Sequence, residues 1–271
     1  MRIPRDARAI VTGAGSGFGR AVSLELAKRG ARVIVSDVNI ASAEETVEQI
    51  ERASGKAHAM RADVREADEV KALVDWSVAE WGGLDVIVNN AGVAVAGRVG
   101  EVPLEDWKLE IDINLMGVVH GCHFAVPVMR RAGRGWVLNV ASAAGLMSAP
   151  TMGPYNATKA AVIALSETMR TELENDHVDV SVLCPTFFRT NIHTAQRSSE
   201  ELKKVSEKLV TKAKWSAEEI ARVAVNGLER RTLYILPQTD IKVLWRLKRV
   251  MGQSFYALVG RAAARVKKAQ R

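Results

Sequence analysis

The chain has 271 residues, 48% of them hydrophobic, and a formal net charge of +7. This length and apolar content predict one large domain with a buried core and make a second domain unnecessary. Two scattered cysteines, Cys122 and Cys184, exclude a disulfide framework and a zinc site. His120 and His123 have no evident third ligand, so no metal centre is expected.

The first distinctive segment is rich in glycine. A short apolar run at 9–11 precedes Thr-Gly-Ala-Gly-Ser-Gly-Phe-Gly at 12–19, and residues 20–30 follow a helical pattern that stops at a glycine. This order favours a phosphate site, because glycines take positive φ and let a pyrophosphate approach the amides of a helix N-terminus. A plain turn is the alternative. The expected cofactor contacts are Gly13, Ser16, Gly17, Phe18 and Gly19.

Asp37 ends the next apolar run, at 32–36. A carboxylate roughly 20 residues beyond the glycines is placed to accept hydrogen bonds from the ribose hydroxyls of NAD. It would repel the 2′-phosphate of NADP, and neither Ser16 nor Val38 offers a cation. NAD is therefore the expected cofactor, with NADP as the second option. The alternative is that Asp37 only caps a helix that begins near Ile40.

The rest of the chain alternates apolar runs, at 85–88, 135–140 and 178–183 among others, with helical stretches. This alternation predicts an α/β fold: a single-domain, Rossmann-like, doubly wound parallel sheet of about seven strands with helices on both faces. Ligands bind such sheets outside the carboxyl ends of the strands.

A tyrosine and a lysine, Tyr155 and Lys159, lie four residues apart in one helical segment. Both side chains then share a helix face, about 5 to 6 Å apart at Cβ. A phenol titrates at about pH 10, so Tyr155 becomes a base at neutral pH only if a cation such as Lys159 or the nicotinamide ring stabilises the phenolate. A lone pair of this kind usually has no function. Ser142, just past the strand at 137–141, indicates a catalytic function for this pair, because its hydroxyl is placed to bind the reacting oxygen.

Together these motifs resemble the short-chain dehydrogenase/reductase family, in the subclass with a T-G-x-x-x-G-x-G turn and a Y-x-x-x-K active site. The resemblance spans about residues 7–236. Its motifs, in the family's order, are Thr12 to Gly19, Asp63-Val64, Asn89-Asn90-Ala91-Gly92, Asn114, Ser142, Tyr155 with Lys159, Pro185 and Thr190. The resemblance implies hydride transfer between an alcohol or ketone and the nicotinamide, with Tyr155 exchanging the substrate proton and Lys159 also holding the nicotinamide ribose.

The resemblance also implies further cofactor contacts. Asp63 and Val64, expected to close the third strand, would contact the adenine ring, unless Asp63 only caps a helix at Glu66. After the fourth strand, small residues permit close approach of the cofactor. The residues implied there are Asn90, Ala91 and Gly92.

Asn114 lies in a helix expected from about 112 to 130 and, by resemblance, completes the catalytic set through a water that leads to Lys159. A capping or kinking role for Asn114 is compatible with that.

The loop after the sixth strand departs from the family pattern. Thr186 stands where the family has glycine, which should restrict the turn. The backbone of Phe188 and the hydroxyl of Thr190 are still expected to hold the nicotinamide carboxamide, and Pro185 is expected in an apolar wall beside the nicotinamide. Residues 191–215 are implied to form a substrate lid. The expected pocket residues, some of which have core packing as the alternative, are Met147, Met152, Phe187, Phe188, Ile192 and Trp215.

The end of the chain is basic: residues 241–271 hold nine Lys or Arg and no Asp or Glu. We expect a catalytic domain at 1–236 and a basic amphipathic helical extension at 237–271. Packing beside the active site or at a subunit interface is favoured for this extension, with weak membrane-surface contact as the alternative. Nucleic-acid binding is not expected, because no recognition fold accompanies the charge.

Two functions are consistent with these features. The favoured one is an NAD-dependent dehydrogenase or reductase for a bulky apolar secondary alcohol or its ketone. The alternative is a nicotinamide-binding regulatory or scaffold protein without turnover, which would not need Ser142, Tyr155, Lys159 and Asn114 together. A homodimer or homotetramer is expected, because family members commonly pair the helices of Asn114 and Tyr155. No segment suggests a signal peptide or membrane span, so cytoplasmic residence is the default expectation.

Overall fold

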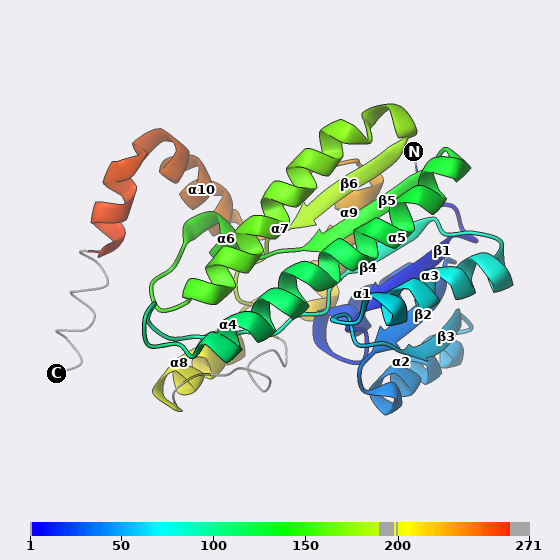
Figure 1. Cartoon of the computed structure of the whole chain (residues 1–271), viewed down its shortest axis with the longest axis horizontal. Coiled ribbons are helices and arrows are strands. Elements are labelled where there is room, and N and C mark those ends of the chain that lie inside the picture. Colours follow the sequence, from blue (N-terminus) through cyan, green and yellow to red (C-terminus); the bar gives the residue numbers. More distant parts are fainter. Residues whose placement is uncertain (1, 190–197, 199, 261–271) are drawn as a thin grey trace.

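The structure is a computed structural model and describes residues 2–189, 198 and 200–260. One sheet of seven parallel strands has the order β3-β2-β1-β4-β5-β6-β7 among these residues (Figure 1). The strands are β1 (Arg8–Thr12), β2 (Arg32–Asp37), β3 (Lys56–Arg61), β4 (Val86–Asn89), β5 (Gly135–Val140), β6 (Val178–Leu183) and β7 (Tyr234–Ile235). The predicted doubly wound α/β fold is confirmed.

Helices cover both faces of the sheet, with α1, α2 and α9 on one face and α3, α5 and α7 on the other. The helices are α1 (Gly17–Lys28), α2 (Ile40–Arg52), α3 (Ala67–Trp81), α4 (Leu104–Ile111), the π-helix η1 (Asp112–Met116), α5 (Gly117–Ala132), α6 (Ala143–Met147), α7 (Gly153–Glu172), the 3-10 helix η2 (Glu174–Asp176), α8 (Glu200–Thr211), α9 (Ala217–Glu229) and α10 (Thr239–Met251).

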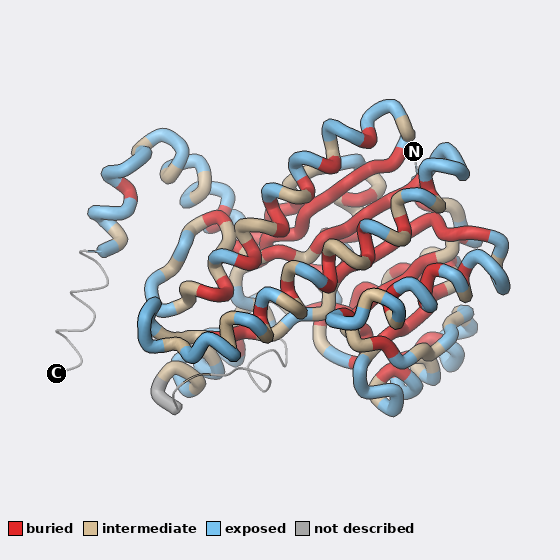
Figure 2. Tube along the Cα trace, in the orientation of Figure 1, coloured by how far each residue is buried: buried red, intermediate tan, exposed pale blue. Residues whose placement is uncertain are grey.

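The central strands are buried on both faces (Figure 2). Ile10 of β1 pairs in register with Ile34 of β2 and Ile87 of β4, and all three belong to the core beneath α3, α5 and α7. The next residue, Val11, belongs to the opposite core beneath α1 and α9. Because successive side chains alternate between two buried faces, these strands are almost uniformly apolar in sequence.

The strand order reverses at β1, which lies between β2 and β4. In such sheets the ligand crevice forms outside the carboxyl ends of the strands at this switch point. The ends of β1 and β4 are tied together there, because the backbone N–H of Asn90 donates to Thr12 Oγ1 at 3.1 Å. The fold therefore brings the glycine turn next to the Asn90 segment.

The helix that carries Asn114 differs from the expected one. It begins at Leu104, earlier than the expected start near 112, and passes through η1 into α5. A π turn inserts a residue into the α-helical ladder and often marks a functional site. Asn114 lies in this turn and is fully buried.

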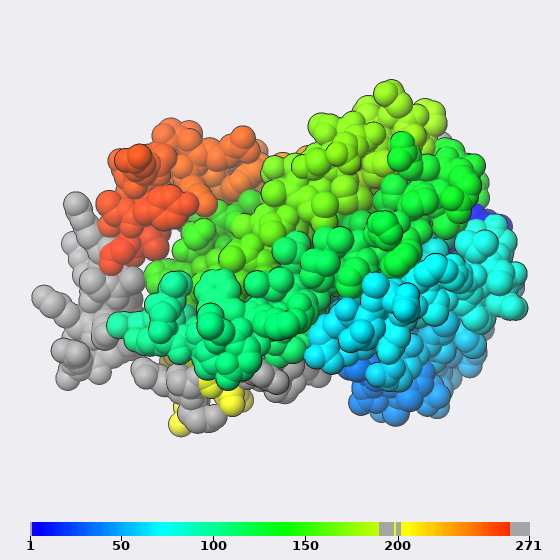
Figure 3. All heavy atoms as spheres, viewed as in Figure 1, coloured from blue at the N-terminus to red at the C-terminus, as the bar shows by residue number. Residues whose placement is uncertain are grey.

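The outer face of this helix carries apolar side chains, among them Ile111 and Met116, between charged ones. By length and composition alone, the stretch Leu104–Ala132 could cross a membrane, a property that core helices of globular proteins share, and 33% of its most apolar window is buried. Its inner face packs on β4, α3 and α7, which accounts for part of the composition. Figure 3 shows this helix beside α7 on the face turned to the viewer.

The structure refines the expected interface on these helices. Val118 and Ile163 belong to the core and are not available to a partner. Other apolar residues of the two helices remain accessible: Ile113, Val119, Val126, Ala160 and Leu165 are half-buried, and Ala164 is exposed. An outward apolar surface over two adjacent helices is what an isologous dimer would bury.

We therefore expect Ala164→Glu to dissociate a homo-oligomer, because a carboxylate would be buried at the centre of the shared face. Light scattering at micromolar concentration measures the result. Ala41→Glu, at an exposed alanine on α2, is the matched control and should leave the oligomer intact. A wild-type protein that is monomeric under these conditions would contradict the prediction.

Candidate active site

Close backbone packing and hydrogen bonds from the end of β4 fix the conformation of the glycine turn between β1 and α1. A Cβ on Gly19 would lie 2.1 Å from the Gly13 carbonyl oxygen, so only glycine allows this approach. Asn90 Nδ2 donates to the carbonyls of Thr12 at 2.8 Å and Gly13 at 3.0 Å. Asn90 thus braces the turn from β4, and Ala91 N–H donates to Thr12 Oγ1 at 3.2 Å.

The N-terminus of α1 is suited to an anion. Its N-cap, Ser16, is exposed and its hydroxyl makes no capping hydrogen bond, whereas Ser142 and Ser216 cap α6 and α9. The first-turn amides, including those of Gly17 and Phe18, are therefore not capped by this side chain. These residues fit the pyrophosphate of a dinucleotide.

Asp37 stands at the end of β2 and reaches the glycine turn. Its Oδ2 accepts from Gly15 N–H at 2.9 Å, and its Oδ1 accepts from Asn39 N–H at 3.0 Å. The N-cap of α2 is Asn39, whose side chain accepts from Ser42 N–H, so the capping alternative for Asp37 does not hold. The half-buried carboxylate is positioned beside the turn, as ribose recognition requires.

Asp63 and Val64 lie past the end of β3, which stops at Arg61. The Asp63 carboxylate pairs with Arg65 at 2.5 Å, and this hydrogen bond holds the pKa of Asp63 below its usual value. Glu66 is itself the N-cap of α3, so the Asp63 side chain does not cap that helix. Val64 is buried, and its carbonyl bonds His120 Nδ1 at 2.9 Å, which ties this segment to α5.

Asn114 is fixed by a set of short contacts. Its Oδ1 accepts from Val93 N–H at 2.8 Å, and its Nδ2 donates to Val93 O at 2.9 Å and to Glu110 Oε1 at 3.1 Å. A Cβ on Gly92 would lie 3.0 Å from Asn114 Oδ1 and 3.5 Å from Lys159 Nζ. The absence of a side chain at Gly92 therefore leaves room between the Asn114 amide and the Lys159 ammonium.

Ser142, Tyr155 and Lys159 come together at the carboxyl edge of β5. Ser142 is the N-cap of α6, with its Oγ accepting from Ala144 N–H at 3.1 Å. Tyr155 and Lys159 lie one turn apart near the start of α7, with Lys159 Nζ 5.8 Å from the centre of the Tyr155 ring. Lys159 Nζ donates to Val140 O at 2.9 Å. The structure thus places these residues as expected from their spacing.

The protein alone does not activate the phenol. Burial raises the pKa of Tyr155 to about 12, against a hydrogen bond from Ser142 that lowers it, and the Glu110 charge raises it further. Burial also lowers the pKa of Lys159 to about 8. The expected stabilisation of the phenolate by Lys159 is not among the causes of this shift, which desolvation dominates.

The loop after β6 is free of the restriction expected from Thr186. Thr186 has no positive φ, so a side chain is accommodated there. Its N–H donates to Gln238 Oε1 at 3.1 Å, and Gln238 is a buried residue at the N-cap of α10. Pro185 O accepts from Ala143 N–H at 2.9 Å. The C-terminal extension therefore helps to shape this loop, while Thr190 and Ile192 lie outside the described residues.

The expected pocket residues divide into two groups. Phe188 packs edge-on against Phe18 at 6.3 Å between ring centres, and both Phe188 and Trp215 lie against the core beneath α1 and α9. The core-packing alternative thus holds for these two. Phe187 is 47% exposed, and Met147 and Met152 are half-buried near α6 and the start of α7. These three remain as candidate substrate contacts.

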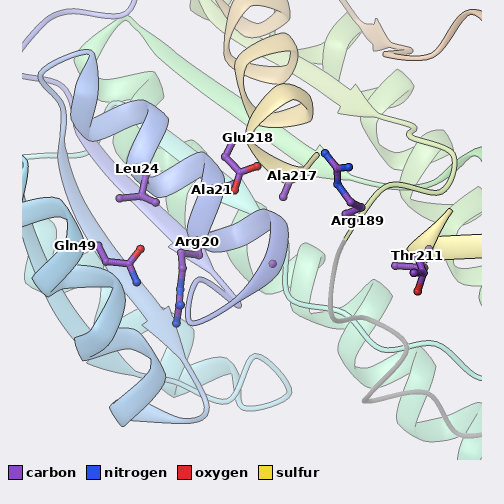
Figure 4. Close-up of a pocket in the computed structure, with 10 residues that line it drawn as sticks. Arg20, Ala21, Leu24, Gln49, Arg189, Thr211, Ala217 and Glu218 are labelled. Atoms are coloured by element: carbon purple, nitrogen blue, oxygen red, sulfur yellow. The ribbon is translucent and has the colours of Figure 1, made fainter. Parts of the chain in front are cut away.

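The two segments that flank the expected lid are hydrogen-bonded to each other. Arg189 N–H donates to Trp215 O at 3.0 Å, and Arg189 and Ser216 form an isolated parallel bridge. A hollow of about 400 Å³ opens here beside Gly17, with walls from α1, α2, α8 and α9 (Figure 4). Neither Ser142 nor Tyr155 lines it, so it borders the glycine turn and is separate from the catalytic residues.

A short chain dehydrogenase family profile matches residues 7–201. The chain belongs to the short-chain dehydrogenase family. This protein is therefore an oxidoreductase of a nicotinamide-dependent family.

Three relatives give the range of similarity. A cyclohexanol dehydrogenase of Acinetobacter sp. (strain SE19) is 34% identical over 196 residues, which cover 72% of this chain and 78% of that protein. The putative oxidoreductase SadH of Mycobacterium tuberculosis is 31% identical over 262 residues, 95% of each chain. A crystal structure of a short chain dehydrogenase/reductase from Burkholderia phymatum in complex with NAD has a TM-score of 0.88 at 32% identity, covering 93% of this chain and 95% of that one.

Three residues near this site did not emerge from the sequence. Glu110 is buried beside Asn114, and Gln238 binds the loop after β6. Arg20 donates to Gly15 O and pairs with Glu45 at 2.9 Å, so a cation does lie near the glycine turn. For Glu110 the only signal was its position four residues before Asn114, and the distant Gln238 had none.

Proposed function

We propose that this protein is an NAD-dependent dehydrogenase or reductase that interconverts a bulky, apolar secondary alcohol and its ketone. The observation that carries the proposal is the convergence of Ser142, Tyr155, Lys159 and Asn114 beside Gly92, next to the glycine turn. A binding protein without turnover has no use for a buried phenol that contacts a serine and lies beside an ammonium.

The proposed chemistry assigns one role to each side chain. When bound, the nicotinamide accepts or supplies the hydride. Tyr155 takes the alcohol proton in oxidation and returns it to the ketone oxygen in reduction, while the Ser142 hydroxyl orients that oxygen. Lys159 holds positive charge near the phenol, and the bound cofactor adds a second positive charge that lowers the pKa of Tyr155.

NAD is proposed over NADP because of Asp37. Its carboxylate faces the glycine turn, and Arg20, the nearby cation, is neutralised by Glu45. A 2′-phosphate would therefore meet net negative charge near the ribose. The relative from Burkholderia phymatum, which was solved with NAD, supports this choice.

An apolar substrate is proposed from the side chains that remain near the catalytic residues. Phe187, Met147 and Met152 offer apolar surface to a substrate, and the nearby Lys248 ammonium is engaged by the Leu146 carbonyl. The Acinetobacter relative is named a cyclohexanol dehydrogenase, which agrees with a cyclic secondary alcohol.

The test is an activity screen of the purified protein. Steroid, terpene and aryl secondary alcohols are offered with NAD and with NADP, their ketones with the reduced cofactors, and the reduced-nicotinamide absorbance is followed. Turnover of an apolar secondary alcohol with NAD is expected, and tight cofactor binding without turnover across the panel would favour a binding protein instead.

We also propose that the C-terminal extension shapes access to the substrate site. Ile241 is buried, Lys248 Nζ donates to Leu146 O on α6, and Trp245 lies 4.8 Å from the Tyr234 ring. Figure 1 shows α10 beside α6, the helix that Ser142 caps.

Truncation after Leu236 is therefore expected to raise KM for bulky substrates or to lower the thermal midpoint, since it removes Gln238 and α10 together. Removal of only the residues after Val266 should change neither. Steady-state kinetics and thermal unfolding measure both variants. Retention of the full chain on anionic vesicles at physiological salt, lost on truncation, would instead favour a membrane-surface role.

A further inference from the structure

Glu110 is a carboxyl group enclosed in the protein one helical turn before Asn114. Its exposure is 0%, which is rare for a glutamate because burial of the charged form is costly. Oε1 accepts from Asn114 Nδ2 at 3.1 Å and from Val95 N–H at 3.3 Å. Oε2 is buried and has no hydrogen-bond partner among the described residues. A neutral carboxylic acid fits such surroundings better than a carboxylate does.

The Asn114 amide is fully engaged because Glu110 is there. Its two N–H bonds point to Val93 O and Glu110 Oε1, and its oxygen accepts from Val93 N–H. Deleting the Glu110 carboxyl would leave one buried donor with only Thr158 Oγ1, at 3.5 Å, as a partner. Glu110 therefore orients Asn114 toward the space beside Lys159.

Glu110 also acts electrostatically on the catalytic pair. The charged and titratable groups that act on its carboxyl are Lys159 on α7 and Asp106 on α4, and Glu110 in turn acts on Tyr155. Burial raises the pKa of Glu110 to about 8, near the value of about 8 to which burial lowers the pKa of Lys159. When Glu110 is ionised, its charge raises the pKa values of both Lys159 and Tyr155.

We propose that Glu110 is a positioning residue of the active site and a titratable charge within it: neutral Glu110 holds Asn114 and leaves the Tyr155 phenolate unopposed, and ionised Glu110 opposes that phenolate. This inference rests on the proposed dehydrogenase function. Ionisation breaks one O–H bond of the carboxyl and sends the proton to solvent, with no change in oxidation state.

Glu110→Gln is the decisive variant, because glutamine keeps an amide oxygen for Asn114 and Val95 but cannot ionise. The first measurement is denaturant unfolding of wild type and variant without cofactor between pH 4.5 and pH 8. An acid whose folded pKa is raised loses stability as pH rises from its unfolded to its folded pKa. The ratio of the unfolding constants, wild type over variant, should therefore grow with pH, by up to about tenfold per unit.

The second measurement is the pH profile of alcohol oxidation at saturating cofactor. Wild-type Glu110 carries its charge only as the pH approaches and exceeds about 8, and there the charge opposes the phenolate. The upper part of the acid limb of the Glu110→Gln profile should therefore move down by about half a unit or more. A residue with only a structural role would scale the whole profile without moving this limb. Glu105→Gln, at an exposed glutamate on the same helix, is the matched control and should leave both measurements unchanged.

Each of the two measurements tests a different part of the proposal. A pH-independent unfolding ratio overturns the titration of Glu110 whether or not the protein is an enzyme. A growing ratio together with superimposable scaled pH profiles overturns its coupling to Tyr155 and Lys159. If no alcohol is oxidised by wild type, the proposed function fails, while the unfolding ratio still decides whether Glu110 is held as a neutral acid.

Discussion

Tyr155→Phe is expected to lower kcat for alcohol oxidation by about a hundredfold or more while leaving NAD binding nearly unchanged. The substitution removes only the hydroxyl that transfers the proton, and general acid–base catalysis contributes at least about that factor. The ring remains packed at the start of α7, so the fold and the cofactor site should be retained.

Steady-state kinetics and a cofactor titration on the same preparation measure this result. Tyr234→Phe is the matched control, since Tyr234 donates its hydroxyl to Glu167, farther along α7. If Tyr155→Phe kept more than about a tenth of the wild-type kcat, a loss of less than roughly 1.4 kcal/mol in the barrier, Tyr155 would not be the catalytic acid and base.

Asp37→Ala is expected to weaken NAD binding and to narrow the preference for NAD over NADP by about 1 to 3 kcal/mol. The cause is the loss of a hydrogen-bonded carboxylate at the ribose together with relief of its repulsion of a 2′-phosphate. Affinities for both cofactors, measured by the quenching of protein fluorescence, give the preference directly.

A second substitution at Asp37 separates the effect of its charge from its effect on the glycine turn. Asp37 also accepts from Gly15 N–H, so the alanine loosens the glycine turn and weakens both cofactors. Asp37→Asn keeps an oxygen for Gly15 and removes only the charge. It should therefore relieve the repulsion of the NADP 2′-phosphate while disturbing the glycine turn less than the alanine does. Tighter binding of NADP than of NAD by the wild type would refute the role given to Asp37.

Local sequence patterns were sufficient to predict the central strands and the glycine turn. The turn is a contiguous segment whose glycines are required by contacts within it, as the 2.1 Å approach at Gly19 shows. The central strands are buried on both faces, so their composition alone marks them, whereas the edge strand β3 is partly exposed and has a mixed sequence. The spacing of Tyr155 and Lys159 sufficed for their shared face, because a helix fixes that geometry.

Side-chain surroundings could not be predicted in the same way. The sequence placed Lys159 beside Tyr155 but could not weigh the attraction of its charge against desolvation, which depends on everything packed around both groups. Nor could it tell a solvated Glu110 from a buried one, since a single acidic residue in a helix is usually exposed.

The sequence by itself determined the family, the sheet and the order of its motifs, because these follow from contiguous patterns of turn residues and apolar periodicity. Only the tertiary structure decided that Glu110 is enclosed next to Asn114, and that Gln238 of the C-terminal extension binds Thr186 across the loop after β6. Burial and contacts between residues far apart in sequence are set by how whole elements pack, and no local pattern encodes them.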